Sequence, residues 1–142
     1  MIIAVDFDGT IVEHKYPKIG KEIPFAIATL KKLQQDGHKL ILWTVRENDL
    51  LDEAVEFCRQ RGVEFFAVNS NYPDENVDAS AIRSRKLKAD MFIDDRNVGG
   101  LPDWGVIYEM ISRRQSYEEY LREMSNIVTP QPKKGIFKKI FG

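Results

Sequence analysis

The chain has 142 residues, of which 43% are hydrophobic and 30% are charged, and its formal net charge is −1 at pH 7. This size and composition suit one ordinary globular domain, and the near-neutral charge excludes a general attraction to long nucleic acid or to anionic membranes. The single cysteine, Cys58, excludes an internal disulfide and favours a reducing, cytoplasmic location, and no apolar stretch is long enough for a membrane span.

Strand and helix signals alternate along the chain. Apolar runs predict strands at residues 2–7, 39–43, 65–68 and 89–93, and residues 104–110 are interpreted as a weaker fifth strand. Helical stripes predict helices from about Pro24 to Gly37, from about Asp49 to Arg61, briefly near Ser80, and after the capping box of Ser116 and Glu119. The alternation predicts an α/β fold, doubly wound and Rossmann-like, with three α/β/α layers around a mainly parallel sheet.

The spacing of these elements predicts a single domain over residues 1–128 and a basic, apolar tail over residues 129–142. Only about a dozen residues separate Thr10 from the first helix, which is too few for an independently folded lid. The loop after the third strand is also short. We therefore expect a site without a cap domain.

Acidic and polar residues follow three of the predicted strands. Asp6 and Asp8 come after the first strand, Thr44 and Arg46 after the second, and Asp94 and Asp95 after the fourth. Ligands of parallel sheets bind at the carboxyl ends of the strands, so we expect these side chains to share one edge. Two neighbouring carboxylates repel each other, and a divalent cation relieves that repulsion. A carboxylate can likewise attack an anionic phosphate ester only where charge is neutralised.

The segment Asp6-Phe7-Asp8-Gly9-Thr10 resembles the first motif of the haloacid dehalogenase superfamily, most of whose members are phosphohydrolases. The resemblance implies that Asp6 is a nucleophile that becomes an aspartyl phosphate. It implies that Asp8 is the acid that protonates the leaving oxygen and then the base that activates water. True dehalogenases of the superfamily lack the second aspartate, so Asp8 favours phosphoryl chemistry.

Further resemblances assign the substrate side of the site. Thr44 occupies the place of a Ser or Thr whose hydroxyl donates to the phosphate. Lys86 matches a lysine that offsets charge between nucleophile and phosphate, with Lys88 as its competitor. Arg46 matches the Ser/Thr-x-Arg of some members, including polynucleotide phosphatases, and its planar fork suits phosphate oxygens. The alternative for Arg46 is a surface arginine paired with an acidic neighbour, Glu47 or Asp49.

The pair Asp94-Asp95 resembles the fourth motif of the superfamily in its double-aspartate form. The resemblance implies a magnesium ion bound by an Asp6 oxygen, by the backbone carbonyl of Asp8, by Asp94 or Asp95, and by waters. Hard oxygen ligands with open water positions suit Mg²⁺. Which of the two last aspartates binds the metal directly stays open.

These features predict a capless, magnesium-dependent phosphatase that hydrolyses a phosphate monoester through an aspartyl phosphate. The alternatives are a phospho-acceptor signalling domain and a catalytically silent phosphate-binding module. Receiver domains carry their paired acids before the phospho-accepting aspartate, whereas here the pair comes last. The substrate class stays open between a small phosphorylated molecule and the phosphorylated end of a larger one. A homo-oligomer whose neighbour covers the open site is also compatible with the sequence.

Overall fold

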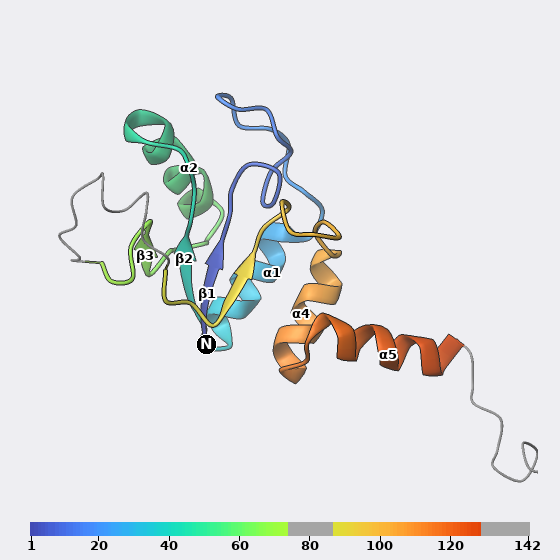
Figure 1. Ribbon diagram of the computed structural model, residues 1–142. Coiled ribbons are helices and arrows are strands. Elements are labelled where there is room, and N and C mark those ends of the chain that lie inside the picture. Colours follow the sequence, from blue (N-terminus) through green and yellow to red (C-terminus); the bar gives the residue numbers. More distant parts are fainter. Residues whose placement is uncertain (74–86, 129–142) are drawn as a thin grey trace, which may run out of the picture. The chain divides into compact units, whose positions relative to one another are not determined.

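Four strands form one sheet in the computed structural model, which describes residues 1–73 and 87–128. The strands are β1 (Ile2–Val5), β2 (Lys39–Leu42), β3 (Ala67–Val68) and β4 (Met91–Ile93). They pair in the order β3-β2-β1-β4, and every pair is parallel (Figure 1). The prediction of a Rossmann-like α/β fold is confirmed, although each strand is shorter than its apolar run.

Two helices connect neighbouring strands in the first of the chain's two compact units, Met1–Gly105. Helix α1 (Ala26–Gln35) joins β1 to β2, and α2 (Asn48–Gln60) joins β2 to β3. The predicted stripes are the buried ones, because Leu30 and Leu33 of α1 and Ala54 and Cys58 of α2 are solvent-excluded. Each helix therefore covers apolar surface that its amphipathic pattern provides.

Side chains alternate between the two faces of the sheet, and both faces are apolar. One face carries a cluster of Ala4, Ile41, Ala67 and Leu87. Ile3 and Val5 of β1 point the other way and are fully buried. Strands that are apolar on both faces are typical of a parallel sheet covered on both sides.

The strand order reverses at β1, and this reversal locates the ligand edge. The chain winds from β1 through β2 to β3, and then returns to place β4 on the other side of β1. In open parallel sheets, loops that leave neighbouring strands in opposite directions create a crevice at such a switch point. The residues that follow β1 and β4 meet there.

The second unit, Val106–Gly142, contains most of α4 (Trp104–Arg113) and all of α5 (Tyr117–Val128). The expected fifth strand at 104–110 is wrong, because this segment is helical. Its apolar positions Trp104, Ile107 and Ile111 repeat with helical spacing, and the Asp103 side chain accepts a hydrogen bond from the Gly105 N–H at 2.8 Å. The residues between them have a high strand propensity and suggested a strand, but the helical repeat of the apolar positions is the better predictor here.

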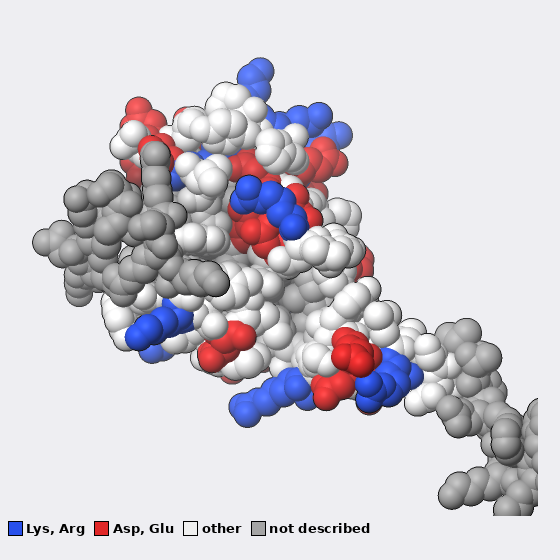
Figure 2. Space-filling model, in the orientation of Figure 1, with Lys and Arg blue, Asp and Glu red and all other residues white. Residues whose placement is uncertain are grey.

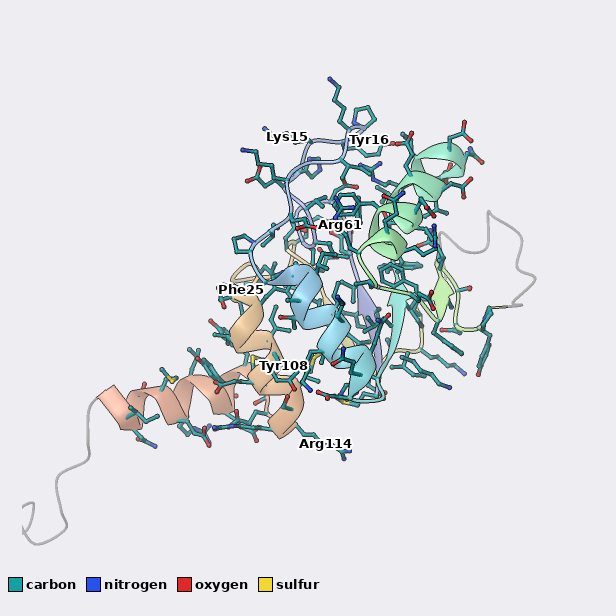
Figure 3. The ribbon with its side chains drawn as sticks, turned by 180° about the vertical axis from the view of Figure 1, so that it is seen from behind. Lys15, Tyr16, Phe25, Arg61, Tyr108 and Arg114 are labelled. Carbon is teal, nitrogen blue, oxygen red and sulfur yellow. The ribbon has the colours of Figure 1, made fainter. Side chains whose placement is uncertain are left out.

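The capping box is confirmed at the start of α5. The Ser116 N–H donates to Glu119 Oε2 at 2.8 Å, and the Glu119 N–H donates to Ser116 Oγ at 3.1 Å. Arg114, labelled in Figure 3, takes a left-handed conformation with φ of 53° between the two helices. Arg113 and Glu123 pair across the turn at 3.0 Å, which holds α4 and α5 in contact.

Two predicted segments, the helical stretch near Ser80 and the tail 129–142, lie outside the described residues. Within the described part, residues 6–25 connect β1 to α1. None of the described helices combines the length and the apolar character that a bilayer crossing requires.

We expect the sheet centre to dominate stability. Ile41 is fully buried in β2, so Ile41→Ala should lower the free energy of unfolding by roughly 2–5 kcal/mol through lost burial and a new cavity. Urea denaturation measures this. Val98→Ala is the control, since Val98 is fully exposed and should change stability by less than about 0.5 kcal/mol. Equal effects of the two changes would contradict the assignment of the core.

Candidate active site

The first group of polar side chains gathers at the carboxyl ends of β1 and β4. Asp6 directly follows β1, and its backbone N–H donates to the carbonyl of Ile93, the last residue of β4, at 3.0 Å. Asp94 and Asp95 follow Ile93. Carboxylate oxygens of Asp6, Asp94 and Asp95 all lie within 4.8 Å of one another. We call these three residues the acid cluster.

Thr10 holds the acid cluster together. Its hydroxyl lies 3.1 Å from Asp6 Oδ2 and 3.2 Å from Asp95 Oδ1, and it accepts the backbone N–H of Asp95 at 3.1 Å. A hydroxyl has one proton, so it donates to one carboxylate at a time while it accepts from the N–H. Trp104 fixes the other side of this residue, because its indole Nε1 donates to the Thr10 carbonyl at 3.0 Å.

Gly9 allows the turn to approach the acid cluster closely. Its φ is +88°, and an added Cβ would lie 2.4 Å from Asp95 Oδ2. The turn itself is tight, because the carbonyl of Phe7 accepts the N–H groups of Thr10, Ile11 and Val12 at 3.2, 2.9 and 3.3 Å. A glycine at this position therefore serves both the backbone conformation and the packing against Asp95.

The acid cluster is electrostatically unfavourable without a cation. The pKa of Asp6 is raised to about 7, first because burial disfavours its charged form, then because of the charge of Asp94 and a hydrogen bond to Asp95. The hydrogen bonds of Asp6 with Thr10 and with the backbone of Phe7 act in the opposite direction. Three oxygen donors with mutual repulsion are a donor set that suits a hard divalent cation.

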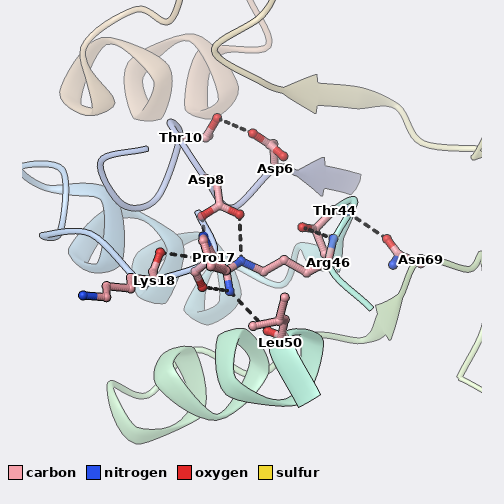
Figure 4. Close-up of polar contacts among 9 residues, drawn as sticks. All are labelled: Asp6, Asp8, Thr10, Pro17, Lys18, Thr44, Arg46, Leu50 and Asn69. Atoms are coloured by element: carbon pink, nitrogen blue, oxygen red, sulfur yellow. Dashed lines mark hydrogen bonds and ion pairs between the residues drawn. The ribbon is translucent and has the colours of Figure 1, made fainter. Parts of the chain in front are cut away.

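Asp8 lies apart from the acid cluster in a buried ion pair with Arg46 (Figure 4). The guanidinium Nε donates to Asp8 Oδ2 at 2.7 Å, and Nη2 donates to Asp8 Oδ1 at 2.8 Å. The Arg46 side chain is fully buried, and Asp8 is 8% exposed. The ring of Phe7 and the ring of Tyr16 each lie 5.2 Å from the guanidinium carbon. The bidentate geometry fixes the orientation of both Asp8 oxygens.

The remaining donors of Arg46 bind backbone carbonyls. Nη1 donates to Pro17 at 3.1 Å and to Leu50 at 3.4 Å, and Nη2 donates to Lys18 at 3.1 Å. A guanidinium has five N–H groups, so each one has an acceptor within the protein. The alternative of a surface arginine paired with Glu47 or Asp49 is wrong. The phosphate contact predicted for Arg46 would require it to give up one of these bonds.

The loop at residues 11–23 is tied to the body of the first unit at both sides. Arg46 binds two of its carbonyls, and Arg61 at the end of α2 forms an ion pair with Glu22. Arg61 also stacks on Phe57, with 3.5 Å between the guanidinium carbon and the ring centre. Figure 3 shows Lys15 and Tyr16 at the far end of this loop. The loop therefore supports Asp8 through Arg46.

Thr44 follows β2 and is positioned from β3. Its backbone N–H donates to Asn69 Oδ1 at 2.8 Å, and its hydroxyl accepts the N–H of Arg46 at 3.2 Å (Figure 4). Asn69 takes a left-handed φ of 51° and donates its own N–H to the Leu42 carbonyl. The sequence pattern did not predict a role for Asn69. Asparagine tolerates the left-handed conformation more readily than most residues, and its place directly after a strand is the signal that could have identified it.

Lys86 lies outside the described residues, so its predicted role at the phosphate stays a prediction. Its competitor Lys88 is exposed, and its backbone N–H donates to Asn71 Oδ1 at 2.7 Å. Arg96 was not singled out by the sequence. Its backbone N–H donates to Asp94 Oδ1 at 3.0 Å, and its Nε lies 3.7 Å from the same oxygen. A guanidinium thus stands beside the acid cluster.

Comparison with known proteins gives one strong match. A solved structure of a conserved protein from Bacteroides thetaiotaomicron is 62% identical, with a TM-score of 0.76 over 84% of this chain and 96% of that one. A D,D-heptose 1,7-bisphosphate phosphatase from B. bronchiseptica, complexed with magnesium and phosphate, is 16% identical, with a TM-score of 0.38 over 54% of this chain and 53% of that one. A TM-score this low does not establish a shared fold. No protein-family model and no curated protein matches the chain.

We expect the buried pair of Arg46 and Asp8 to be costly to break. Arg46→Met removes the partner of a buried carboxylate and should destabilise the protein by roughly 3–5 kcal/mol in urea denaturation. Arg59→Met is the matched control, because Arg59 also binds a carboxylate with two nitrogens, at 2.7 and 2.6 Å from Glu56, but at the surface. The control should cost less than about 1 kcal/mol. Similar losses in both variants would contradict a special role of the buried pair.

Proposed function

The chain belongs to the family of the conserved protein from Bacteroides thetaiotaomicron, and we propose that it is a magnesium-dependent phosphatase of the haloacid dehalogenase type. One observation carries the proposal. Carboxylates from two distant segments of the sequence, Asp6 and the pair Asp94-Asp95, meet within 4.8 Å at the switch point of the sheet, and Arg46 orients a fourth carboxylate, Asp8. That is the arrangement that the resemblance of the aspartate motifs implies.

Asp6 is the proposed nucleophile. Its oxygen attacks phosphorus, the bond from phosphorus to the ester oxygen breaks, and an acyl phosphate forms on Asp6. Asp8 must carry a proton for the first step, in which it gives that proton to the departing oxygen; as the carboxylate it then takes a proton from water, which restores its protonated form. That water attacks phosphorus, releases inorganic phosphate and restores Asp6. Both steps balance without a further reactant.

Arg46 is proposed to position Asp8 in place of the phosphate contact suggested by its sequence. Both oxygens of Asp8 accept from Arg46, yet each carboxylate oxygen has a second lone-pair direction for proton transfer. The carbonyls of Pro17, Lys18 and Leu50 hold the guanidinium, so it keeps its orientation while Asp8 transfers a proton. The arrangement restricts Asp8 to one orientation, which favours transfer to an oxygen in a fixed place.

Magnesium would be held by Asp6 and by Asp94 or Asp95, and the resemblance adds the backbone carbonyl of Asp8. When bound, the ion would neutralise charge on the phosphate and on the carboxylates. Thr10 keeps Asp6 and Asp95 in place through its hydroxyl. The Thr44 hydroxyl would donate a hydrogen bond to the phosphate, and Lys86 would contribute a positive charge.

We predict that Asp6→Asn abolishes phosphatase activity and leaves the fold intact, because the amide keeps the shape and lacks the nucleophilic charge. Release of phosphate from p-nitrophenyl phosphate with excess magnesium should fall by more than about a thousandfold. Asp52→Asn is the control, since Asp52 is exposed on α2 and should retain full activity. Comparable turnover in Asp6→Asn and wild type would place the nucleophile elsewhere. Absent turnover in the wild type would favour the signalling or the silent phosphate-binding alternative.

We predict that magnesium stabilises the acid cluster. Adding Mg²⁺ to chelator-treated protein should raise the thermal midpoint by several degrees, since saturation at about 100 times the dissociation constant adds about 2.7 kcal/mol. The double variant Asp94→Asn/Asp95→Asn should lose most of this shift. Asp52→Asn should keep it. Scanning calorimetry measures the thermal midpoint. An equal shift of the midpoint in the wild type and in the double variant would show that magnesium binds elsewhere.

A further inference from the structure

A pocket of about 490 Å³ adjoins the acid cluster on the side of β2 and β3. Its apolar lining comes from Trp43, Val45, Leu51 and Val68. Six polar residues complete the lining: Thr44, Arg46, Glu47, Asn48, Asn69 and Arg96. Trp43 and Thr44 follow β2, Val68 ends β3, and Leu51 belongs to the first turns of α2. A pocket of this size at the ligand edge of a parallel sheet can hold a small molecule.

Arg96 connects the pocket to the acid cluster, because it lines the pocket and its Nε lies 3.7 Å from Asp94 Oδ1. Arg96 follows β4, which pairs with β1 on the side away from β2. The rest of the lining comes from the side of β2 and β3. To line the same pocket, the Arg96 side chain must extend over the carboxyl end of β1, where Asp6 lies. In the space-filling view, one basic side chain lies over a patch of acidic side chains, with uncharged side chains beside it (Figure 2).

Arg96 is also available to an anion. Its side chain is 68% exposed, and its Nε is 3.7 Å from Asp94, which is longer than a hydrogen bond. Arg46, in contrast, has all five N–H groups bound within the protein. Of these two arginines, Arg96 is the one whose donors can bind a phosphoryl oxygen above Asp6.

The lining of the pocket points to an apolar occupant. Val45 is 69% exposed, and Trp43 is only partly covered, packing in part against the apolar cluster of the sheet. Val45 and Trp43 thus leave apolar surface exposed to water at the carboxyl edge of the sheet. An apolar ligand would cover this surface. A glycerol-like chain would cover less of this apolar surface than a ring does, and would gain less from leaving water.

We propose that this pocket binds the leaving group of the substrate and selects phosphate monoesters of a flat, apolar alcohol, such as one that carries an aromatic ring, over polyol phosphates. The identification of the occupant as a leaving group rests on the proposed phosphatase function. The phosphoryl group lies at Asp6 beneath Arg96, and the ring extends between Trp43 and Val45. Selectivity therefore comes from the loop after β2 and from β3, without a cap domain.

Non-hydrolysable ligands test the pocket independently of turnover. The affinities of benzylphosphonate and 2,3-dihydroxypropylphosphonate are measured by titration calorimetry with excess magnesium. Wild-type protein should bind the benzyl compound at least about tenfold more tightly, since apolar contacts of this extent give such ratios. Val45→Ser should reduce this preference at least threefold, and Val98→Ser, a fully exposed valine outside the pocket, should leave it unchanged.

Each result decides one proposal. Equal affinities for the two phosphonates, no binding of benzylphosphonate, or equal effects of the Val45 and Val98 substitutions would overturn the pocket assignment. Retained phosphatase activity in Asp6→Asn bears only on the nucleophile. A preference for the benzyl compound in a protein without phosphatase activity would support the pocket and reject the proposed reaction.

Discussion

The buried contact between Arg46 and Asp8 is the constraint on which the site depends. An arginine without solvent access must have all its donors satisfied, because an unpaired buried charge is expensive. Here Asp8 accepts two of the five, and backbone carbonyls of the loop 11–23 and of α2 accept the others. One guanidinium therefore joins three segments of chain. The orientation of Asp8, the course of the loop and the start of α2 are fixed together.

The acid cluster shows the opposite balance. Among the described residues, Arg96 is the basic side chain paired with this cluster, through an exposed contact of 3.7 Å to Asp94, and Thr10 and Gly9 fix the distance at which the carboxylates meet. The strand order brings them together, because β4 returns to pair with β1 at the point of reversal. Asp8 is thus neutralised by a buried arginine, whereas the acid cluster has one exposed arginine beside three carboxylates, a surplus of acidic groups that a divalent cation would suit.

The sequence predicted the strands, the first two helices and the edge at which the polar residues gather, because these depend on local apolar periods and on the geometry of parallel sheets. The prediction failed at residues 104–110, where strand propensity favoured a strand but the spacing of the apolar residues is that of the helix observed. It also could not assign the partner of Arg46. An arginine that follows a strand has the same local pattern whether it faces a phosphate, water or a buried aspartate 38 residues earlier. Asn69 was missed for the same reason, since the backbone that its side chain binds follows another strand, and Arg96 was missed because its place in the pocket depends on residues that follow β2 and β3.

The chain has two tryptophans, and they lie on different parts of the site. Trp43 lines the pocket beside β2, whereas Trp104 is buried and hydrogen-bonded to the carbonyl of Thr10, whose hydroxyl touches the acid cluster. The protein therefore carries two intrinsic fluorophores with separate surroundings. A soluble quencher reaches Trp43 more readily than Trp104, so emission from single-tryptophan forms would separate events in the pocket from events at the carboxylates without any added label.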